Sequence, residues 1–296
     1  MDIKESQRMA EATKIIDRVR TMSEDFVGIG MPVSIDEDAV DKLAEAMETE
    51  GKMSFTVESV DDMSQHQAVL TELFASAINY CFWYGRYDFR PMLGGSTTMY
   101  DLIIDAVQNK FEGTVGPELI NSILDGLIFD RYPLIEERTK HLLETTLGTQ
   151  EFVMFVLSNR ENDARIVLHE LVRRYPGFAS DMFLKRAFLF VIQLNRKLNF
   201  FREIDEIPVP ADYQVPKMLE HFGCLKYKQS LSDKIKFHTI IPKYSLEEVS
   251  IRGGTVMVCD KLAMKTGWTK SEIDAWLWLR RKECTKPFHL TITTDY

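Results

Sequence analysis

One predicted helix, at residues 181–201, is apolar around almost its whole circumference. Projected at helical spacing, Phe183 and Phe190 fall on one face, whereas Leu184 and Phe188 fall on the opposite face. A helix that is apolar all round is typical of the inside of a protein or of a membrane. No run in this chain approaches the roughly 18 apolar residues of a membrane span. The sequence therefore predicts a helix at the centre of a globular fold.

Most of the remaining chain has the same helical period. The predicted helices are residues 5–21, 36–50, 67–83, 98–110, 117–129, 133–146, 149–158, 162–174 and 213–222, with one more beginning at a Ser245 cap and a last one after a Thr269 cap. Only Met53–Val60 and the last ten residues alternate like short strands. We expect an all-α, two-lobed helical domain over residues 61–296 with the pocket between its lobes, preceded by a helical segment at 1–60 that could serve as a lid.

Charge and cysteine content exclude several classes of protein. The net charge of −9 argues against a protein that binds nucleic acid along an extended basic face. The four cysteines lie far apart, without the spacing of a zinc site or a disulfide framework. The first residues contain no apolar core of a signal peptide. We expect a cytoplasmic protein without membrane contact, metal or other cofactor.

Lys185 is the first candidate functional residue, because it lies within the apolar helix at 181–201. Burying a lysine is costly unless an anion accompanies it. The anion could be a neighbouring Asp or Glu, which is a purely structural role, or the phosphate or carboxylate of a ligand. The sequence favours neither explanation.

The segment from Ile207 to Tyr227 contains the second candidate, Asp212. Three prolines keep the start of this segment extended. Asp212 then stands where a helix N-cap is expected, with the helix at 213–222 and Gly223 as a left-handed stop. Asp212 could be a cap alone or a rigidly held functional carboxylate.

Two further groups combine aromatic rings with polar atoms. In the segment INYCFWYGRYDF, Asn79 and Trp83 stand beside Arg86 and Tyr87, a composition that suits a planar heterocycle but is also common in cores. In the last helix, Asp274 and Trp278 share a face with Leu277 and Arg281, so that a carboxylate and an indole project together.

These groups point to one type of chemistry. Two carboxylates, a phosphate-binding cation and aromatic walls suit cleavage of the N-glycosidic bond of a nucleotide. The transition state resembles an oxocarbenium ion, so a carboxylate at Asp212 could stabilise its positive charge or accept a proton from the attacking water. A second carboxylate at Asp274 could hydrogen-bond the departing heterocycle.

A resemblance to a known family supports this interpretation. The segments INYCFW (78–83), FLKRA (183–187), ADYQVP (211–216), GCLKY (223–227), EEVSIRGG (247–254), DAWLW (274–278) and PFH (287–289) resemble those of the queuosine salvage proteins in order and spacing. These are queuosine 5′-phosphate N-glycosylases whose all-helical fold is similar to that of helix-hairpin-helix DNA glycosylases.

The resemblance implies a role for individual residues. Asp212 would be the catalytic carboxylate, Lys185 a phosphate ligand, and Asp274 with Tyr213 contacts to the deazaguanine base of a small-molecule nucleotide. The matching segments extend the candidate substrate-binding set to four more residues, and His66, just upstream of them, completes it. These additional candidates are Asn79, Trp83, Arg252, Trp278 and His66.

Three positions depart from the family pattern and keep other functions open. Pro210, Gln193 and Leu279 stand where the family usually has an aromatic residue, an aspartate and an acidic residue. One alternative is a phage enzyme that resembles DNA glycosylases and acts on hypermodified thymine in DNA; the basic cluster at 280–282 favours it. The other is a non-catalytic protein that binds a modified base.

Overall fold

The computed structural model describes residues 3–53, 63–85 and 94–296 of the 296-residue chain, and the side chains from residue 6 onward within these ranges. Among these residues it contains fourteen α-helices and a single two-stranded sheet, which confirms the all-α prediction. None of the described helices is long and apolar enough to cross a bilayer. Most of the strand predicted at 53–60 (residues 54–60), together with Arg86 and Tyr87, lies outside the described residues.

The chain folds as two compact units. Unit 1 takes in Met1–Met9, Val57–Glu203 and Thr293–Tyr296, and unit 2 takes in Ala10–Thr56 and Ile204–Ile292. Helix α1 (Ile3–Asp25) begins in the first and continues in the second. The expected boundary at residue 60, the lid, the pocket between two lobes and the likeness to helix-hairpin-helix glycosylases stay predictions.

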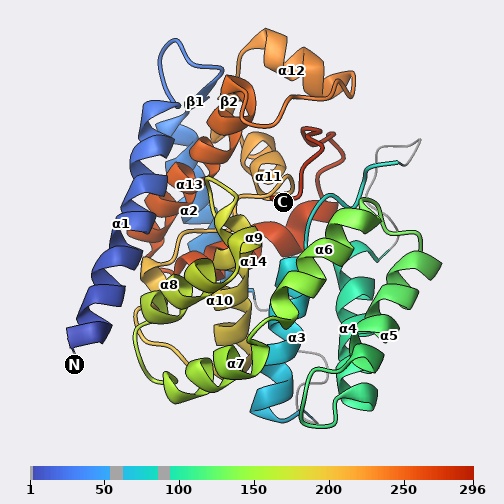
Figure 1. Ribbon diagram of the computed structural model, residues 1–296. Helices are drawn as coiled ribbons and strands as arrows, with labels where there is room; N and C mark the ends of the chain where they lie inside the picture. The colour runs from blue at the N-terminus through green and yellow to red at the C-terminus, as the bar shows by residue number, and fades with distance from the viewer. Residues whose placement is uncertain (1–2, 54–62, 86–93) are drawn as a thin grey trace. The chain divides into compact units, whose positions relative to one another are not determined.

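Unit 1 is built around α10 (Lys185–Leu198), which is the apolar helix of the sequence. It packs against α3 (Gln65–Ala77), α8 (Ala164–Arg174) and α9 (Pro176–Ala179), and α3 in turn contacts α4 (Gly95–Lys110), beside which lies α5 (Pro117–Phe129) (Figure 1). The remaining helices of the unit are α6 (Ile135–Thr146) and α7 (Thr149–Ser158). Every residue of α10 from 185 to 192 is buried, which confirms the predicted central helix.

The start of α10 differs from the prediction by four residues. Leu184 adopts a left-handed conformation with φ of 53°, so the helix cannot run back to 181. Asp181 instead accepts hydrogen bonds from the amides of Phe183 (3.0 Å) and Lys185 (2.8 Å). The carboxylate thus satisfies amides that no helical carbonyl reaches, and α10 begins at Lys185.

Unit 2 is organised around α13 (Leu246–Thr266). This helix packs against α2 (Glu37–Glu50), α11 (Val215–His221), α14 (Lys270–Leu279) and the strand β1 (Val33–Ile35), which pairs antiparallel with β2 (Leu225–Tyr227). The remaining elements are α12 (Gln229–Lys236) and the 3₁₀ turns η1 (Ile204–Glu206) and η2 (Arg280–Lys282). The sequence analysis did not predict α12, a short helix with only two buried residues.

Two glycines let other elements approach α13 closely. A Cβ on Gly253 would lie 3.1 Å from the Cα of Ser23 in α1, and one on Gly254 would lie 2.8 Å from Leu225 Cδ2. The helix therefore contacts α1 and β2 where a side chain would obstruct them.

The caps of α13 and α14 follow the sequence closely. Thr269 and Glu272 form the full capping box of α14. At α13, the Ser245 hydroxyl accepts from the Glu248 amide (3.3 Å), but Glu248 accepts from the amide of Tyr244 (3.1 Å) rather than that of Ser245. The predicted Ser245 cap is therefore confirmed, and the bond that Glu248 returns is made to the residue before the cap.

Candidate functional site

Asp212 lies at the start of α11 with one carboxylate oxygen fixed and the other available. Its Oδ1 accepts hydrogen bonds from the amides of Gln214 (2.7 Å) and Val215 (3.0 Å). The helix begins at Val215, so the prediction that it begins at Tyr213 with Asp212 as N-cap is wrong by two residues, although the capping chemistry is retained. Within the described part of the chain, both hydrogen bonds to the half-buried Asp212 end on Oδ1.

Arg252 of α13 holds the backbone directly before Asp212. Its side chain is fully buried, and Nε donates to the carbonyl of Ala211 (3.1 Å). Nη1 donates to Oε1 of Glu248 (3.3 Å), which is buried as well. Arg252, predicted to contact substrate, is thus engaged in positioning the loop that carries the candidate catalytic residue.

The ring of Tyr213 is part of a small aromatic layer. Tyr213 is buried, and its ring centroid lies 4.6 Å from that of Phe288, with a tilt of 32° between the planes. Next to Phe288, His289 is buried, and this burial, followed by the charge of Arg252, lowers the pKa of His289 to about 3. His289 is therefore a neutral imidazole at physiological pH.

Two cations of unit 2 are electrostatically coupled to Asp212. The guanidinium of Arg281 stacks on the indole of Trp278, 3.3 Å from its centroid, and Nη1 donates to the Trp278 carbonyl (2.9 Å). Lys217 donates to the carbonyl of Arg281 (2.8 Å) and is half-buried in α11. Burial lowers the pKa of both cations, and the Asp212 carboxylate opposes this shift in each.

The second candidate carboxylate, Asp274, is buried in α14, with only 5 % of its surface exposed. It lies near enough to Cys259 that its charge adds to the effect of burial, and together they raise the pKa of that thiol. Trp278, one turn further along α14, is half-buried. Asp274 and Trp278 therefore lie on one helix, as the sequence predicted. The structure also shows that Arg281 contacts the indole of Trp278.

In unit 1, two predicted site residues contact each other directly. Lys185 is buried, with 3 % exposed, and its Nζ donates to both the backbone carbonyl and the side-chain Oδ1 of Asn79 (2.9 Å each). These oxygens are neutral, so they satisfy donors of the ammonium without neutralising its charge.

Lys185 belongs to a larger group of cations at the carboxyl end of α3. Arg186 donates to the carbonyl of Ala77, and Arg138 donates to those of Ile78 and Tyr80. Four consecutive carbonyls therefore receive hydrogen bonds from buried cationic side chains, in the region where the helix dipole is negative. The INYCFW segment is held from several directions, and with it Asn79.

Trp83 and His66 are in unit 1, where each ring lies beside another aromatic ring. Trp83 is buried and meets the ring of Tyr84 edge-on, with centroids 6.1 Å apart. The ring of His66 lies 5.1 Å from that of Phe111, and burial lowers the pKa of His66. Both environments are those of packed side chains, and a role in binding stays a prediction.

The structure thus groups the candidates by unit. Unit 2 contains Asp212, Tyr213, Arg252, Asp274 and Trp278, and unit 1 contains Lys185, Asn79, Trp83 and His66. The sequence analysis did not assign a role at Asp212 to Lys217, Phe288 or His289. The signals were present: Lys217 follows Tyr213 by four residues in the helix predicted at 213–222, and PFH is one of the segments that carry the family resemblance.

Comparisons with known proteins show which family the chain resembles. A family model described as queuosine salvage protein matches residues 60–294. The queuosine 5′-phosphate N-glycosylase/hydrolase of Sphaerobacter thermophilus is 28% identical, over 94% of this chain and 97% of its own length. The protein of the same name from Dictyostelium discoideum is 27% identical, over 91% of this chain and 95% of its own length.

Proposed function

The chain belongs to the queuosine salvage protein family, and on this basis we propose that it hydrolyses the N-glycosidic bond of a queuosine-type nucleoside 5′-monophosphate. The products are the free 7-deazaguanine-type base and ribose 5-phosphate. The relatives that match over nearly their whole length are named for this activity. The proposal includes a free nucleotide as substrate and a cytoplasmic location. The four buried, free cysteines support the location.

The proposal rests mainly on the position of the Asp212 carboxylate at the start of α11. Because two backbone amides fix Oδ1, the orientation of the carboxylate is set before substrate binds. Cleavage of the bond to the base leaves positive charge on the ribose ring. In this mechanism, the Asp212 carboxylate stabilises that charge, or accepts the proton of the water that attacks the anomeric carbon.

The other residues bind and orient the two ends of the nucleotide. Asp274 is a buried carboxylate that can accept a hydrogen bond from the N–H edge of a deazaguanine, and the ring of Tyr213 offers a contact to the base. Lys185 is assigned to the 5′-phosphate on the family resemblance, and the two oxygens of Asn79 that accept from its Nζ hold the ammonium in a defined position.

The basic cluster that favoured a DNA substrate is engaged inside unit 2. Arg280 forms ion pairs with Glu50 and Glu283 and lies 4.3 Å from the ring centroid of Trp276. Arg281 is stacked on Trp278. Two of the three cations therefore have partners within the protein, and the nucleotide substrate is the better supported of the two.

The test is incubation of the purified protein with queuosine 5′-monophosphate, the unphosphorylated nucleoside and guanosine 5′-monophosphate. We expect release of free base from the first, detected by chromatography, with stoichiometric ribose 5-phosphate. Recovery of all three compounds intact after long incubation would leave only a binding protein. Equal turnover of guanosine 5′-monophosphate would contradict recognition of the modified base.

A further inference from the structure

Unit 2 contains a cavity of about 250 Å³ on the side of α11 that carries Lys217. Its wall is formed by α11, β2, α12 and the segment that follows η2. The side chains that matter for its charge and shape are Lys217, Glu220, Lys236, Lys286, Phe288 and His289. In the proposal above, none of these residues has a role.

The charges around this cavity favour an anion. Three lysines and one glutamate line it, and His289 adds no charge because its pKa is about 3. Glu220 is paired with Lys286 through both carboxylate oxygens (2.7 and 2.8 Å). Among the described residues, neither Lys217 nor Lys236 has a carboxylate within ion-pair distance, although the more distant Asp212 carboxylate acts on Lys217. The lining therefore carries more positive than negative charge.

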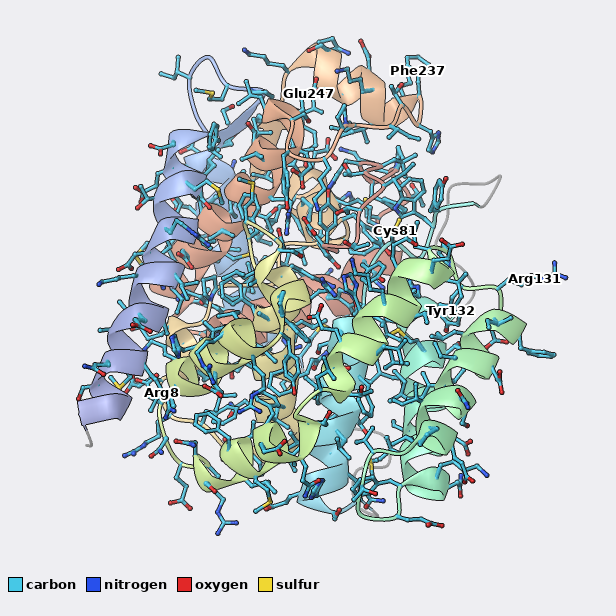
Figure 2. All side chains as sticks on the ribbon, viewed as in Figure 1. Arg8, Cys81, Arg131, Tyr132, Phe237 and Glu247 are labelled. Carbon is cyan, nitrogen blue, oxygen red and sulfur yellow. The ribbon has the colours of Figure 1, made fainter. Side chains whose placement is uncertain are left out.

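Lys217 is held in place by two backbone carbonyls. Its Nζ donates to the backbone carbonyls of Arg281 (2.8 Å) and Cys284 (3.4 Å), which leaves one of its three N–H groups for another acceptor. It is half-buried, and a buried ammonium is stabilised by an anionic partner. Lys236, by contrast, is exposed at the end of α12, next to Phe237, which is labelled in Figure 2.

The size and the remaining lining indicate more than a bare ion. Tyr227 and Ser232 contribute hydroxyl groups, whereas Ile235 and Pro287 contribute apolar surface. Phe288 forms part of the wall and also stacks on Tyr213, the residue after Asp212. The cavity is therefore adjacent to the candidate catalytic segment through one shared ring.

We propose that this cavity is a binding site for a sugar phosphate, in which Lys217, Lys236 and Lys286 hold the phosphate group and the hydroxyl and apolar lining accommodates the sugar. The inference rests on the proposed function only in its choice of ligand, since ribose 5-phosphate is the product of that reaction. Through this cavity, the protein would bind the ribose 5-phosphate that its own reaction releases.

The test is calorimetric titration of the full chain with ribose 5-phosphate, inorganic phosphate and ribose at matched ionic strength. The proposal predicts that ribose 5-phosphate binds more tightly than inorganic phosphate and that uncharged ribose does not bind. Equal affinities of ribose 5-phosphate and inorganic phosphate overturn the sugar part of the proposal. Absence of any heat with ribose 5-phosphate overturns it entirely.

Opposite charge changes around the cavity give the sharper comparison. Glu220→Gln removes the single negative charge of the cavity lining, and we expect it to tighten the binding of ribose 5-phosphate by about three- to tenfold. We expect Lys236→Ala to weaken this binding by a similar factor. Lys282→Ala, an exposed lysine of η2 outside the cavity lining, is the matched control and leaves affinity unchanged. Binding that ignores Glu220→Gln and Lys236→Ala but is lost in Lys185→Met places the phosphate in unit 1 and refutes the site.

The outcome is separable from that of the proposed reaction. If the protein cleaves no nucleotide but binds ribose 5-phosphate with the charge dependence above, the reaction fails and the site stands. If it releases base and its affinity for ribose 5-phosphate is indifferent to Glu220 and Lys236, the reaction stands and the site fails.

Discussion

Asp212 combines a structural and a chemical role in one side chain, and two substitutions separate them. Asn keeps an oxygen that accepts from the amides of Gln214 and Val215, whereas Ala removes it. We expect Asp212→Ala to lower the free energy of unfolding by about 0.5–2 kcal/mol and Asp212→Asn to lower it by less. Urea unfolding of both variants measures the difference. Equal stabilities would show that the turn does not depend on this carboxylate.

Arg252 and Glu248 form a fully buried ion pair behind Asp212. Breaking a buried pair costs more unfolding free energy than breaking a pair at the surface. Removing one partner leaves the other charge buried and the Ala211 carbonyl without its donor. We expect Arg252→Met to cost about 3–5 kcal/mol in unfolding free energy. The double variant Arg252→Met/Glu248→Gln is the control, and a loss equal to that of the single variant would contradict this explanation.

At the level of residues, the sequence identified groups but not their partners. Lys185 was expected to be buried beside an anion, and the structure pairs it with Asn79, which the aromatic segment had suggested for a different reason. Arg252 was expected at the substrate; the structure shows it holding Ala211, and its contact with substrate stays a prediction. Such contacts join residues 41 to 106 positions apart, and no local pattern encodes them.

Close packing of α13 is the element-scale property with the clearest consequence. A Cβ on Gly254 would lie 2.8 Å from Leu225 Cδ2 and 3.3 Å from Val33 Cγ1, so these two buried side chains would have to move. We expect Gly254→Ala to lower the unfolding free energy by about 1–3 kcal/mol, although alanine is the better helix former. Gly116→Ala is the control, because nothing lies within 4 Å of its Cβ position.

Thermal denaturation followed by circular dichroism compares the two glycine variants directly. A Gly254→Ala protein as stable as the wild type would mean that the side chains of Leu225 and Val33 move aside at no cost. The Gly116→Ala protein should remain within about 1 kcal/mol of the wild type, as expected for an open site.

Most helices were predictable because their caps and apolar periods are local. Residues 117–129 and 149–158 form helices with the predicted bounds, and α2 begins after its Asp36 cap. The start of α10 was missed because Leu184 adopts a positive φ, which the sequence does not mark. The pairing of β1 with β2 was missed because each has three residues and they lie far apart in the chain.

At the scale of the whole molecule, His289 makes stability depend on pH. Its folded-state pKa of about 3 lies below the ordinary value of about 6.5, so the unfolded chain binds a proton that the folded chain does not. Stability from this residue is present above pH 6.5 and is lost as pH falls toward 3. We expect a loss of about 2 kcal/mol between pH 7 and pH 5.

Urea unfolding at the two pH values measures this dependence. In His289→Gln the difference between pH 7 and pH 5 should be smaller by about the same 2 kcal/mol. His221→Gln is the control, because this histidine is exposed in the last turn of α11. An unchanged pH dependence in the His289 variant would show that the imidazole is not neutral when folded.

The central claim is that the Asp212 carboxylate catalyses hydrolysis of the glycosidic bond of a queuosine-type nucleotide. It is tested most directly by the rate of base release from queuosine 5′-monophosphate by the wild type and by Asp212→Asn, which keeps the backbone hydrogen bonds. We predict release by the wild type and a loss of about a thousandfold or more in the variant. Undiminished release by Asp212→Asn would contradict the account.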